Sequence, residues 1–270
     1  MVELYEQNLR GENRQSSKGN QLKWLQDGNW YKADYTGYEG LSEYVVSALL
    51  KLSGFSEDEY VPYETEEIRY GHQIFRGCKS RNFLPKGWQM ITLERLFTQA
   101  YGQGLNRSIY RMPDHENRLR FLVDQVERIT GLTEFGRYMC RQLTLDTFFL
   151  NEDRHTHNLA VLMDSAGQYY YCPFFDHGAS LLADTTLDYP MGADIDELMK
   201  TVKAKTFCEN FDEQLDIAEK LYGQQVRFAF SKKTVSDLLD VEAVYPEEIK
   251  VRVKEILFRQ IRKYQYLFQE

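Results

Sequence analysis

Three polar residues in the middle of the chain have the types and spacing that phosphoryl transfer requires. Asp153 is followed five residues later by Asn158, and Asp176 stands two residues before a glycine. In a kinase active site, one such carboxylate orients the attacking hydroxyl and other oxygens hold Mg²⁺ against the nucleotide phosphates. Mg²⁺ keeps several waters, so one carboxylate and one amide oxygen suffice as protein ligands. We therefore predict Asp153 as the catalytic base and Asn158 and Asp176 as metal ligands.

The chain between these residues predicts a β-hairpin. Residues 159–163 are apolar, residues 165–167 are turn-forming, and residues 169–175 are aromatic and β-prone. A single Asp more often only caps a helix or a turn, which is the alternative role for Asp153 and Asp176. Their joint spacing favours the metal site.

A predicted strand and the helix after it offer the cation and carboxylate that a nucleotide-binding lobe needs. Residues 22–35 predict a β-hairpin, and residues 40–52 have the apolar spacing of a helix. Lys32 lies on the second strand and Glu43 near the start of the helix, so an ion pair would position the lysine at the phosphates. Glu39 is the rival partner, although its place at the helix start suits the helix dipole better. The alternative is a solvated lysine and an exposed glutamate, which the downstream motif disfavours.

A polar segment with a single glycine precedes the first of these strands. Gly19 would let backbone N–H groups approach a phosphate, and Lys18 or Lys23 would add positive charge. The three glycines of an ordinary protein-kinase loop are absent. Taken alone, the segment is a polar turn.

This loop resembles a motif of the HipA family of bacterial serine/threonine kinases. Four residues match that family's Ser-x-x-Gly-x-Gln-x-Lys loop position by position: Ser16, Gly19, Gln21 and Lys23. The resemblance implies that the glycine, glutamine and lysine, together with Asn20, contact the nucleotide.

The same resemblance extends to the downstream motifs. Block 153–158 is similar to the family's Asp-x-His-x-x-Asn catalytic loop, and residues 31–44 look most like the short CtkA-type branch. It implies a two-lobed protein-kinase-like fold, ATP and Mg²⁺ as cofactors, and transfer of phosphate to Ser or Thr. His155 joins the cofactor-binding set. The loop serine of HipA-type toxins is itself phosphorylated, so Ser16 and Ser17 are the candidates for autophosphorylation.

The partners follow from the same likeness. We expect a protein substrate with a Ser or Thr acceptor, and the resemblance implies an antitoxin-like regulator. The resemblance covers roughly residues 16–180, so we expect no counterpart here of the additional N-terminal subdomain of full-length HipA. This departure leaves antitoxin docking and a toxin role open.

Length and pattern predict an α+β protein with two lobes. A chain of 270 residues can bury a sizeable core. We expect residues 1–85 to form a small β-rich N-lobe with one helix, and residues 86–270 a larger, mainly α-helical C-lobe. We expect the polar stretch up to about residue 14 to be mobile. Apolar stripes predict C-lobe helices over 114–131, 135–148, 207–221 and 246–267.

Charge and hydropathy exclude several classes of protein. A net charge of −8 argues against general nucleic-acid binding, which needs a basic surface. No apolar run reaches the length of a membrane span, and the N-terminus has no signal-peptide core. The four cysteines are widely separated, which is typical of buried thiols in a reducing cytosol. We expect a cytoplasmic protein, and signal-less export stays compatible with these observations.

Two alternatives stand beside a kinase. The first is a metallohydrolase with a Zn²⁺ or Mn²⁺ site, because His-x-His on a strand points both rings to one side. Its ligands would be Asp153, His155, His157, Asp176 and His177. In a kinase, the first histidine would instead pack beneath the loop and hold the catalytic Asp, while the second would face solvent. The other alternative is a catalytically silent nucleotide-binding module, suggested by the irregular glycine loop and opposed by the intact polar set.

Overall fold

The computed structural model describes residues 1–9 and 21–268, and these form two compact units. The first unit comprises the described parts of Met1–Phe83, Phe175–Val202 and Arg227–Glu270. The second comprises Leu84–Phe174 and Lys203–Val226. Each unit therefore collects segments that are distant in the sequence.

This grouping differs from the predicted division at residue 85. The first boundary falls close to it, at Phe83, but residues 175–202 and 227–270 group with the N-terminal sheet. The reason is packing, because the helix at Lys232–Asp240 contacts the helix at Glu39–Leu52. The two functional lobes stay a prediction, whereas the α+β class is confirmed.

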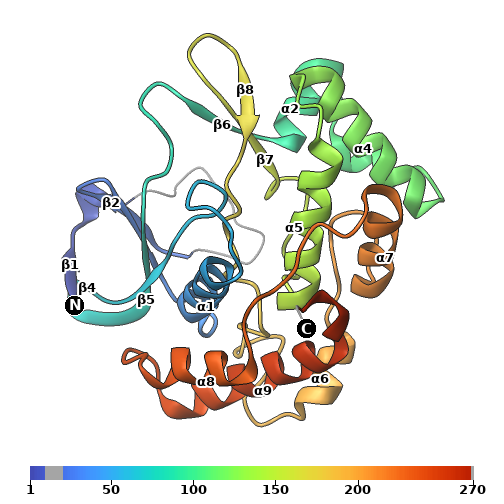
Figure 1. Ribbon diagram of the computed structural model, residues 1–270. Helices are drawn as coiled ribbons and strands as arrows, with labels where there is room; N and C mark the ends of the chain where they lie inside the picture. Colours follow the sequence, from blue (N-terminus) through green and yellow to red (C-terminus); the bar gives the residue numbers. More distant parts are fainter. Residues whose placement is uncertain (10–20, 269–270) are drawn as a thin grey trace. The chain divides into compact units, whose positions relative to one another are not determined.

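A five-stranded sheet is the base of the first unit (Figure 1). Its strands, in the spatial order β1-β4-β5-β3-β2, are β1 (Val2–Leu4), β4 (Glu64–Tyr70), β5 (Gln73–Arg81), β3 (Asn29–Ala33) and β2 (Lys23–Gln26). The hairpin of β2 and β3 is confirmed. Asp27 and Gly28 between them both have positive φ, as the tightest hairpin turns require. The expectation of a mobile stretch is wrong for its first residues, since β1 pairs with β4 and buries Leu4, and residues 10–14 lie outside the described part of the chain.

Helix α1 (Glu39–Leu52) packs against β4 and β5 of this sheet. Two glycines permit the close approach. A Cβ on Gly40 would lie 2.5 Å from the carbonyl carbon of Gly77, and a Cβ on Gly77 would overlap the carbonyl oxygen of Lys32. Only glycine fits at both positions, and this contact fixes how near the helix lies to the strand that carries the lysine.

The C-terminal helices also belong to the first unit (Figure 1). They are α6 (Ile195–Thr201), α8 (Lys232–Asp240) and α9 (Glu247–Lys263), and short 3-10 turns occur at Glu6–Asn8 and Gln265–Leu267. The α8 and α9 helices pack together, and Arg259 Nε of α9 lies 2.7 Å from Asp196 Oδ1 of α6. The predicted last helix thus ends at Lys263, four residues early.

The second unit is mainly helical and carries a small sheet (Figure 1). Its helices are α2 (Leu93–Tyr101), α3 (Leu105–Ile109), α4 (His115–Thr130), α5 (Phe135–Phe149) and α7 (Phe211–Tyr222). Its strands, β6 (Gln89–Thr92), β7 (Ala160–Met163) and β8 (Tyr169–Tyr171), pair in that order. The predicted hairpin is therefore present, as β7 and β8.

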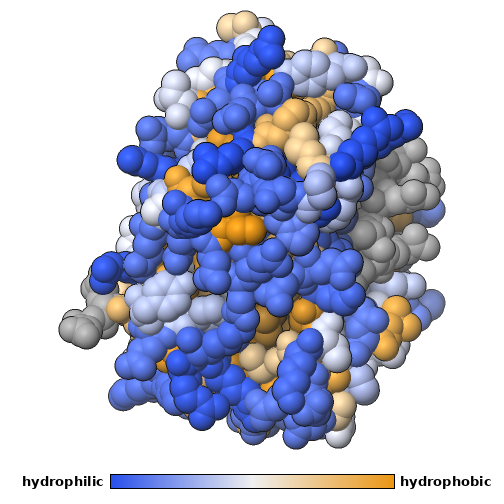
Figure 2. Space-filling model, turned by 90° about the vertical axis from the view of Figure 1, so that its right-hand side faces the viewer, coloured by the Kyte–Doolittle hydropathy of each residue, from blue (hydrophilic) through white to orange (hydrophobic). Residues whose placement is uncertain are grey.

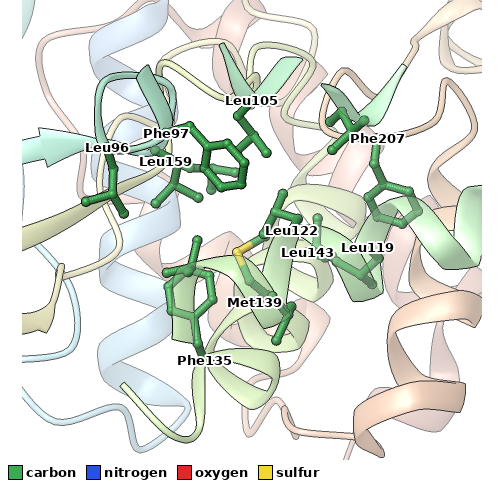
Figure 3. Close-up of a cluster of buried hydrophobic side chains, with 14 of the residues drawn as sticks. Leu96, Phe97, Leu105, Leu119, Leu122, Phe135, Met139, Leu143, Leu159 and Phe207 are labelled. Carbon is green, nitrogen blue, oxygen red and sulfur yellow. The ribbon is translucent and has the colours of Figure 1, made fainter. Parts of the chain in front are cut away.

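The core of this unit lies between α4, α5 and their neighbours (Figure 3). Met139 and Leu143 of α5 and Leu119 and Leu122 of α4 are buried there, at the helical spacing seen in the sequence. Asp114 caps α4 by accepting the N–H of the third helical residue, and a left-handed Gly ends it. The predicted 207–221 helix begins only at residue 211, because Asn210 is its cap.

The surface in Figure 2 is mostly hydrophilic, with apolar side chains in small separate groups. Within the described ranges, no helix combines the length and apolarity needed to cross a membrane.

Candidate active site

Lys32 on β3 is the centre of a buried ionic cluster in the first unit. Its Nζ lies 2.6 Å from Glu43 Oε1 and 2.8 Å from Asp176 Oδ1. The three side chains are 13%, 2% and 30% exposed, respectively. The predicted contact between strand lysine and helix glutamate is therefore present. The rival, Glu39, instead accepts backbone N–H groups of Thr36 and Gly37 at the start of α1.

The carboxylates keep this lysine charged. Burial acts to lower the pKa of Lys32, but the negative charges of Asp176 and Glu43 outweigh it and hold the pKa well above its ordinary value. For Glu43, burial raises the pKa, Lys32 opposes this and Asp176 reinforces it. The lysine is thus a fixed cation, held between a buried carboxylate and a more accessible one.

Lys23 on β2 adds a second cation to the same region. It lies directly opposite Lys32 in the antiparallel pair, an arrangement that is unfavourable for like charges without an anion nearby. Burial lowers the pKa of Lys23, Asp176 opposes this effect, and Lys32 adds to it. Gln21 is half-buried just before this strand. The other predicted loop residues, Ser16, Ser17, Gly19 and Asn20, lie outside the described part of the chain.

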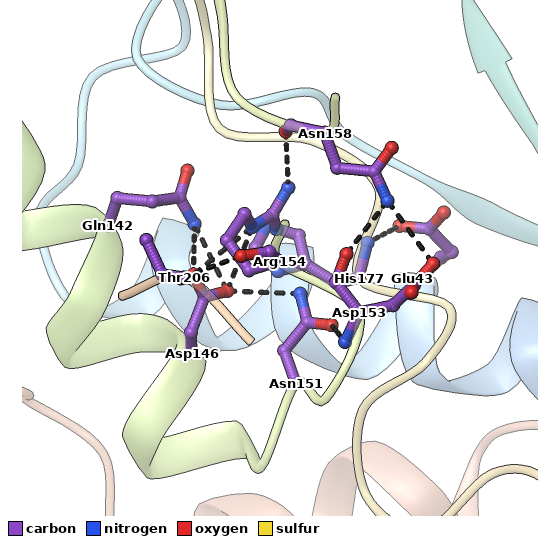
Figure 4. A network of polar contacts seen from close by, with 9 residues as sticks. All are labelled: Glu43, Gln142, Asp146, Asn151, Asp153, Arg154, Asn158, His177 and Thr206. Atoms are coloured by element: carbon purple, nitrogen blue, oxygen red, sulfur yellow. Dashed lines mark hydrogen bonds and ion pairs between the residues drawn. The ribbon is translucent and has the colours of Figure 1, made fainter. Parts of the chain in front are cut away.

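Helix α1 also holds the backbone after Asp176. The second oxygen of Glu43, Oε2, accepts the N–H of His177 at 2.7 Å (Figure 4). Asp176 itself has φ of 61°, a left-handed conformation that costs a non-glycine residue on the order of 1 kcal/mol. One buried glutamate therefore positions both the lysine and the strained Asp.

Further bonds hold the segment that follows. Ser42 Oγ of α1 donates to Ser180 O at 3.0 Å, and the Tyr38 hydroxyl donates to Leu181 O at 2.6 Å. Arg252 of α9 donates through Nε to the Tyr38 hydroxyl and through Nη2 to Tyr189 O. Helix α9 therefore supports the segment that begins with Asp176, the predicted metal ligand. We did not predict this support from the sequence.

Asp153 lies in a turn of the second unit, and its side chain is 13% exposed. Asn158 Nδ2 donates to Asp153 O at 2.8 Å and to its Oδ2 at 3.2 Å (Figure 4). These bonds use the amide nitrogen, so the amide oxygen is the atom of Asn158 suited to bind a metal. The predicted base and one predicted ligand are therefore in direct contact.

His155 lies beside the predicted base. Its Nδ1 accepts the N–H of His157 at 3.2 Å, which assigns the ring proton to Nε2, 3.7 Å from Asp153 Oδ1. That distance is too long for a hydrogen bond. Burial lowers the pKa of His155, although Asp153 opposes the shift. The ring is a neutral neighbour of the carboxylate.

The structure does not show the strand geometry on which the metallohydrolase alternative was based. Neither His155 nor His157 lies on a strand, and their rings meet edge-on with centroids 5.5 Å apart. His157 is exposed, as the kinase interpretation expects.

A buried ion pair beneath the loop was not foreseen. Arg154 is 1% and Asp146 0% exposed, and Arg154 Nε lies 3.1 Å from both carboxylate oxygens (Figure 4). Arg154 Nη1 also donates to Asn158 O at 3.1 Å. Burial raises the pKa of Asp146, and Arg154 opposes the shift. The pair ties α5 to the loop that carries both predicted functional residues.

The network continues on either side of this pair. Gln142 and Asn151 each donate to Asp146, and Asn151 Oδ1 accepts the N–H of Asp153 (Figure 4). Thr206 Oγ1 donates to the carbonyl oxygen of Arg154 at 2.6 Å. The sequence offered one signal for this network, a Gln and an Asp four residues apart within the predicted 135–148 helix.

Comparison with solved structures identifies the type of fold. No family model matches the chain, and no curated protein sequence is similar to it. Among solved structures, it is similar to the Helicobacter pylori proinflammatory kinase CtkA, with a TM-score of 0.64, 16% identity, and coverage of 98% of this chain and 96% of that one. It is also similar to Shewanella oneidensis HipA, solved with HipB and operator DNA, with a TM-score of 0.53, 12% identity, and coverage of 95% and 66%. The chain therefore has a kinase-like fold of the HipA and CtkA type.

Proposed function

We propose that this chain is an ATP- and Mg²⁺-dependent serine/threonine protein kinase of HipA-like type that phosphorylates itself. The observation that carries the proposal is the contact of Lys32 with both Glu43 and Asp176. A buried strand lysine between a helix glutamate and the Asp of an Asp-x-Gly motif is the arrangement that kinases use to bind nucleotide phosphates. The kinase-like fold supports the same conclusion.

The donor groups fit Mg²⁺ and ATP. Asp176 and Asn158 offer carboxylate and amide oxygens, the ligands that a hard cation prefers, and we assign them as the metal ligands. Lys32 and Lys23 offer two adjacent cations for phosphate oxygens. When bound, Mg²⁺-ATP supplies the phosphoryl group that is transferred. Gly19, Asn20, Gln21 and His155 complete the proposed nucleotide-contacting set.

Asp153 would act on the acceptor. Its carboxylate accepts the proton of the Ser or Thr hydroxyl as that oxygen attacks phosphorus. Asn158 holds the carboxylate through Nδ2, and the Arg154–Asp146 pair holds the loop. These contacts keep the base oriented before substrate arrives, which is the main protein contribution to such reactions.

The test measures phosphate transfer and nucleotide binding separately. The full chain is incubated with γ-labelled ATP and Mg²⁺, and label is followed on the chain and on a generic Ser/Thr substrate. Asp153→Asn should lower the transfer rate by about 10²–10⁴-fold, the usual contribution of a general base, with ATP affinity unchanged. His157→Gln, an exposed change in the same loop, is the matched control and should retain activity.

Several results would contradict the proposal. Transfer that survives Asp153→Asn would remove the base assignment. A wild type that binds ATP but transfers nothing would be a silent nucleotide-binding module. Zn²⁺-dependent release of phosphate from esters would favour the metallohydrolase alternative.

Phosphopeptide mapping tests autophosphorylation. We expect label at Ser16 or Ser17. Ser180 is fully buried, and the Thr185 and Thr186 hydroxyls donate to Thr36 O, so these are poorer acceptors. Label confined to those three residues would contradict the loop assignment.

We further propose a cytoplasmic location, a Ser/Thr protein substrate and an antitoxin-like regulator. HipA, solved together with HipB, is the neighbour that suggests the regulator.

A further inference from the structure

A group of three potential metal ligands lies in the second unit, away from the catalytic-loop residues in sequence. The ligand atoms of His115, Cys208 and Glu213 all lie within 4.8 Å of one another. His115 is the first residue of α4, Glu213 lies in the first turn of α7, and Cys208 lies in the loop before α7. Three separate places in the chain therefore present a nitrogen, an oxygen and a sulfur to one point.

We propose that these residues form a Zn²⁺ site with water as the fourth ligand. Imidazole, carboxylate and thiolate are the ligands Zn²⁺ takes, at about 2.0–2.3 Å in tetrahedral geometry. Neighbouring ligand atoms of such a site are about 3.4 Å apart, so the three need to move by only about 1 Å. The site is independent of the proposed kinase function.

The present contacts indicate which bonds the metal would replace. His115 Nδ1 lies 2.6 Å from Glu213 Oε1, and the two side chains are 33% and 47% exposed, so both can open around an ion. Cys208 is 1% exposed, and its thiol donates to Asn210 O at 3.3 Å. On binding, the Cys208 thiol proton leaves to solvent, and Zn–S, Zn–N and Zn–O bonds to the three residues replace bonds between the ion and water, so the net charge of the site rises by one.

The position of the cysteine gives the site a structural consequence. Its loop is held to the rest of the unit by Arg118 Nη1, which donates to Phe207 O at 2.9 Å, and by Thr206, which donates to Arg154 O at 2.6 Å. A metal bridging α4, the loop and α7 would lock these contacts, because a metal that binds the folded chain adds its binding free energy to folding. Bound Zn²⁺ should therefore raise the unfolding temperature.

Co²⁺ and Zn²⁺ are the probes, used on the full chain purified without a histidine tag. Co²⁺ should bind one per chain and give a thiolate charge-transfer band in the near ultraviolet. Cys208→Ser should lose the band, whereas Cys140→Ser should keep it. Cys140 is the matched control, being buried in the same unit with its thiol bonded to a carbonyl oxygen, Gly223 O, at 3.3 Å.

Zn²⁺ titration by calorimetry completes the test. His115→Gln and Glu213→Gln should each weaken Zn²⁺ binding by at least about tenfold, and the Zn²⁺-dependent rise in unfolding temperature should disappear in Cys208→Ser. A missing charge-transfer band, or equal Zn²⁺ affinity in Cys208→Ser and wild type, would overturn the proposal. In that case His115 and Glu213 form only a surface hydrogen-bonded pair.

Discussion

Removal of the Lys32 charge should destabilise the first unit in a pH-dependent way. Lys32→Met keeps most of the aliphatic stem but leaves Glu43, which is 2% exposed, without its cation. Breaking a buried ion pair by removing one partner costs about 3–5 kcal/mol. Asp176 is 30% exposed and can recover some hydration, so we expect about 3 kcal/mol at pH 8.

The pH dependence follows from Glu43. Burial already raises its pKa against the opposing charge of Lys32, and loss of that charge must raise the pKa further. A carboxyl group whose pKa is raised in the folded state stabilises the fold fully at pH values below its pKa in the unfolded state, which is about 4.3 for Glu. That contribution is lost as the pH rises through the folded pKa. Lys32→Met should therefore lower the free energy of unfolding less at pH 5 than at pH 8. The difference is up to about 1.4 kcal/mol for each pH unit crossed.

Urea unfolding of wild type and mutant between pH 5 and pH 8, followed by tryptophan fluorescence, measures this difference. The matched control is Lys79→Met on β5, because Lys79 pairs with Glu64 and Glu66 at 3.1 and 3.3 Å and is 33% exposed. Its partner Glu64 is 74% exposed, and a solvent-accessible pair of this kind contributes about 0–1 kcal/mol. If Lys32→Met costs no more than the control, or costs the same at every pH, then Lys32 does not hold Glu43 ionised.

Two further predictions concern other buried charges. Arg154→Met should lower the unfolding free energy by about 3–5 kcal/mol, because it leaves Asp146 unpaired at 0% exposure; a loss below about 1 kcal/mol in urea unfolding would mean that the carboxylate is hydrated. Burial raises the pKa of Asp34 to about 7, with Glu39 adding to the shift and the Tyr245 hydroxyl opposing it. Asp34 therefore stabilises the fold fully below about pH 3.9, and this contribution is lost as the pH rises through 7. The free energy of unfolding of the wild type should decline between pH 5 and 8, and Asp34→Asn should make this decline shallower. Equal slopes for the two proteins would contradict that assignment.

Local spacing explains what the sequence could predict. The β2–β3 hairpin follows from its turn residues, and α1 follows from apolar periodicity, so Lys32 and Glu43 could be placed on neighbouring elements. The contact of Asn158 with Asp153 spans only five residues and is equally local. Such predictions need no knowledge of how distant segments pack.

Contacts between distant segments explain what the sequence could not predict. Arg252 reaches Tyr38 across 214 residues, and His115 meets Glu213 across 98. Neither pair has a characteristic spacing, because the fold alone brings such residues together. The grouping of 227–270 with the sheet has the same origin, and it made a single division at residue 85 differ from the observed units.

In both units, a buried carboxylate holds a segment that begins with a strained backbone residue. Each contains a non-glycine residue in the left-handed region at the start of a predicted functional segment, Asp176 in one and Leu150 in the other. Such backbone costs on the order of 1 kcal/mol and persists only where surrounding contacts fix it. In the first unit a buried carboxylate, Glu43, binds both the lysine and the backbone N–H that follows Asp176. In the second unit a buried carboxylate, Asp146, binds Arg154 and the side chain of Asn151. Because a charged acceptor makes stronger hydrogen bonds than a neutral one, a single buried carboxylate in each unit can offset the strain and hold the segment in one conformation.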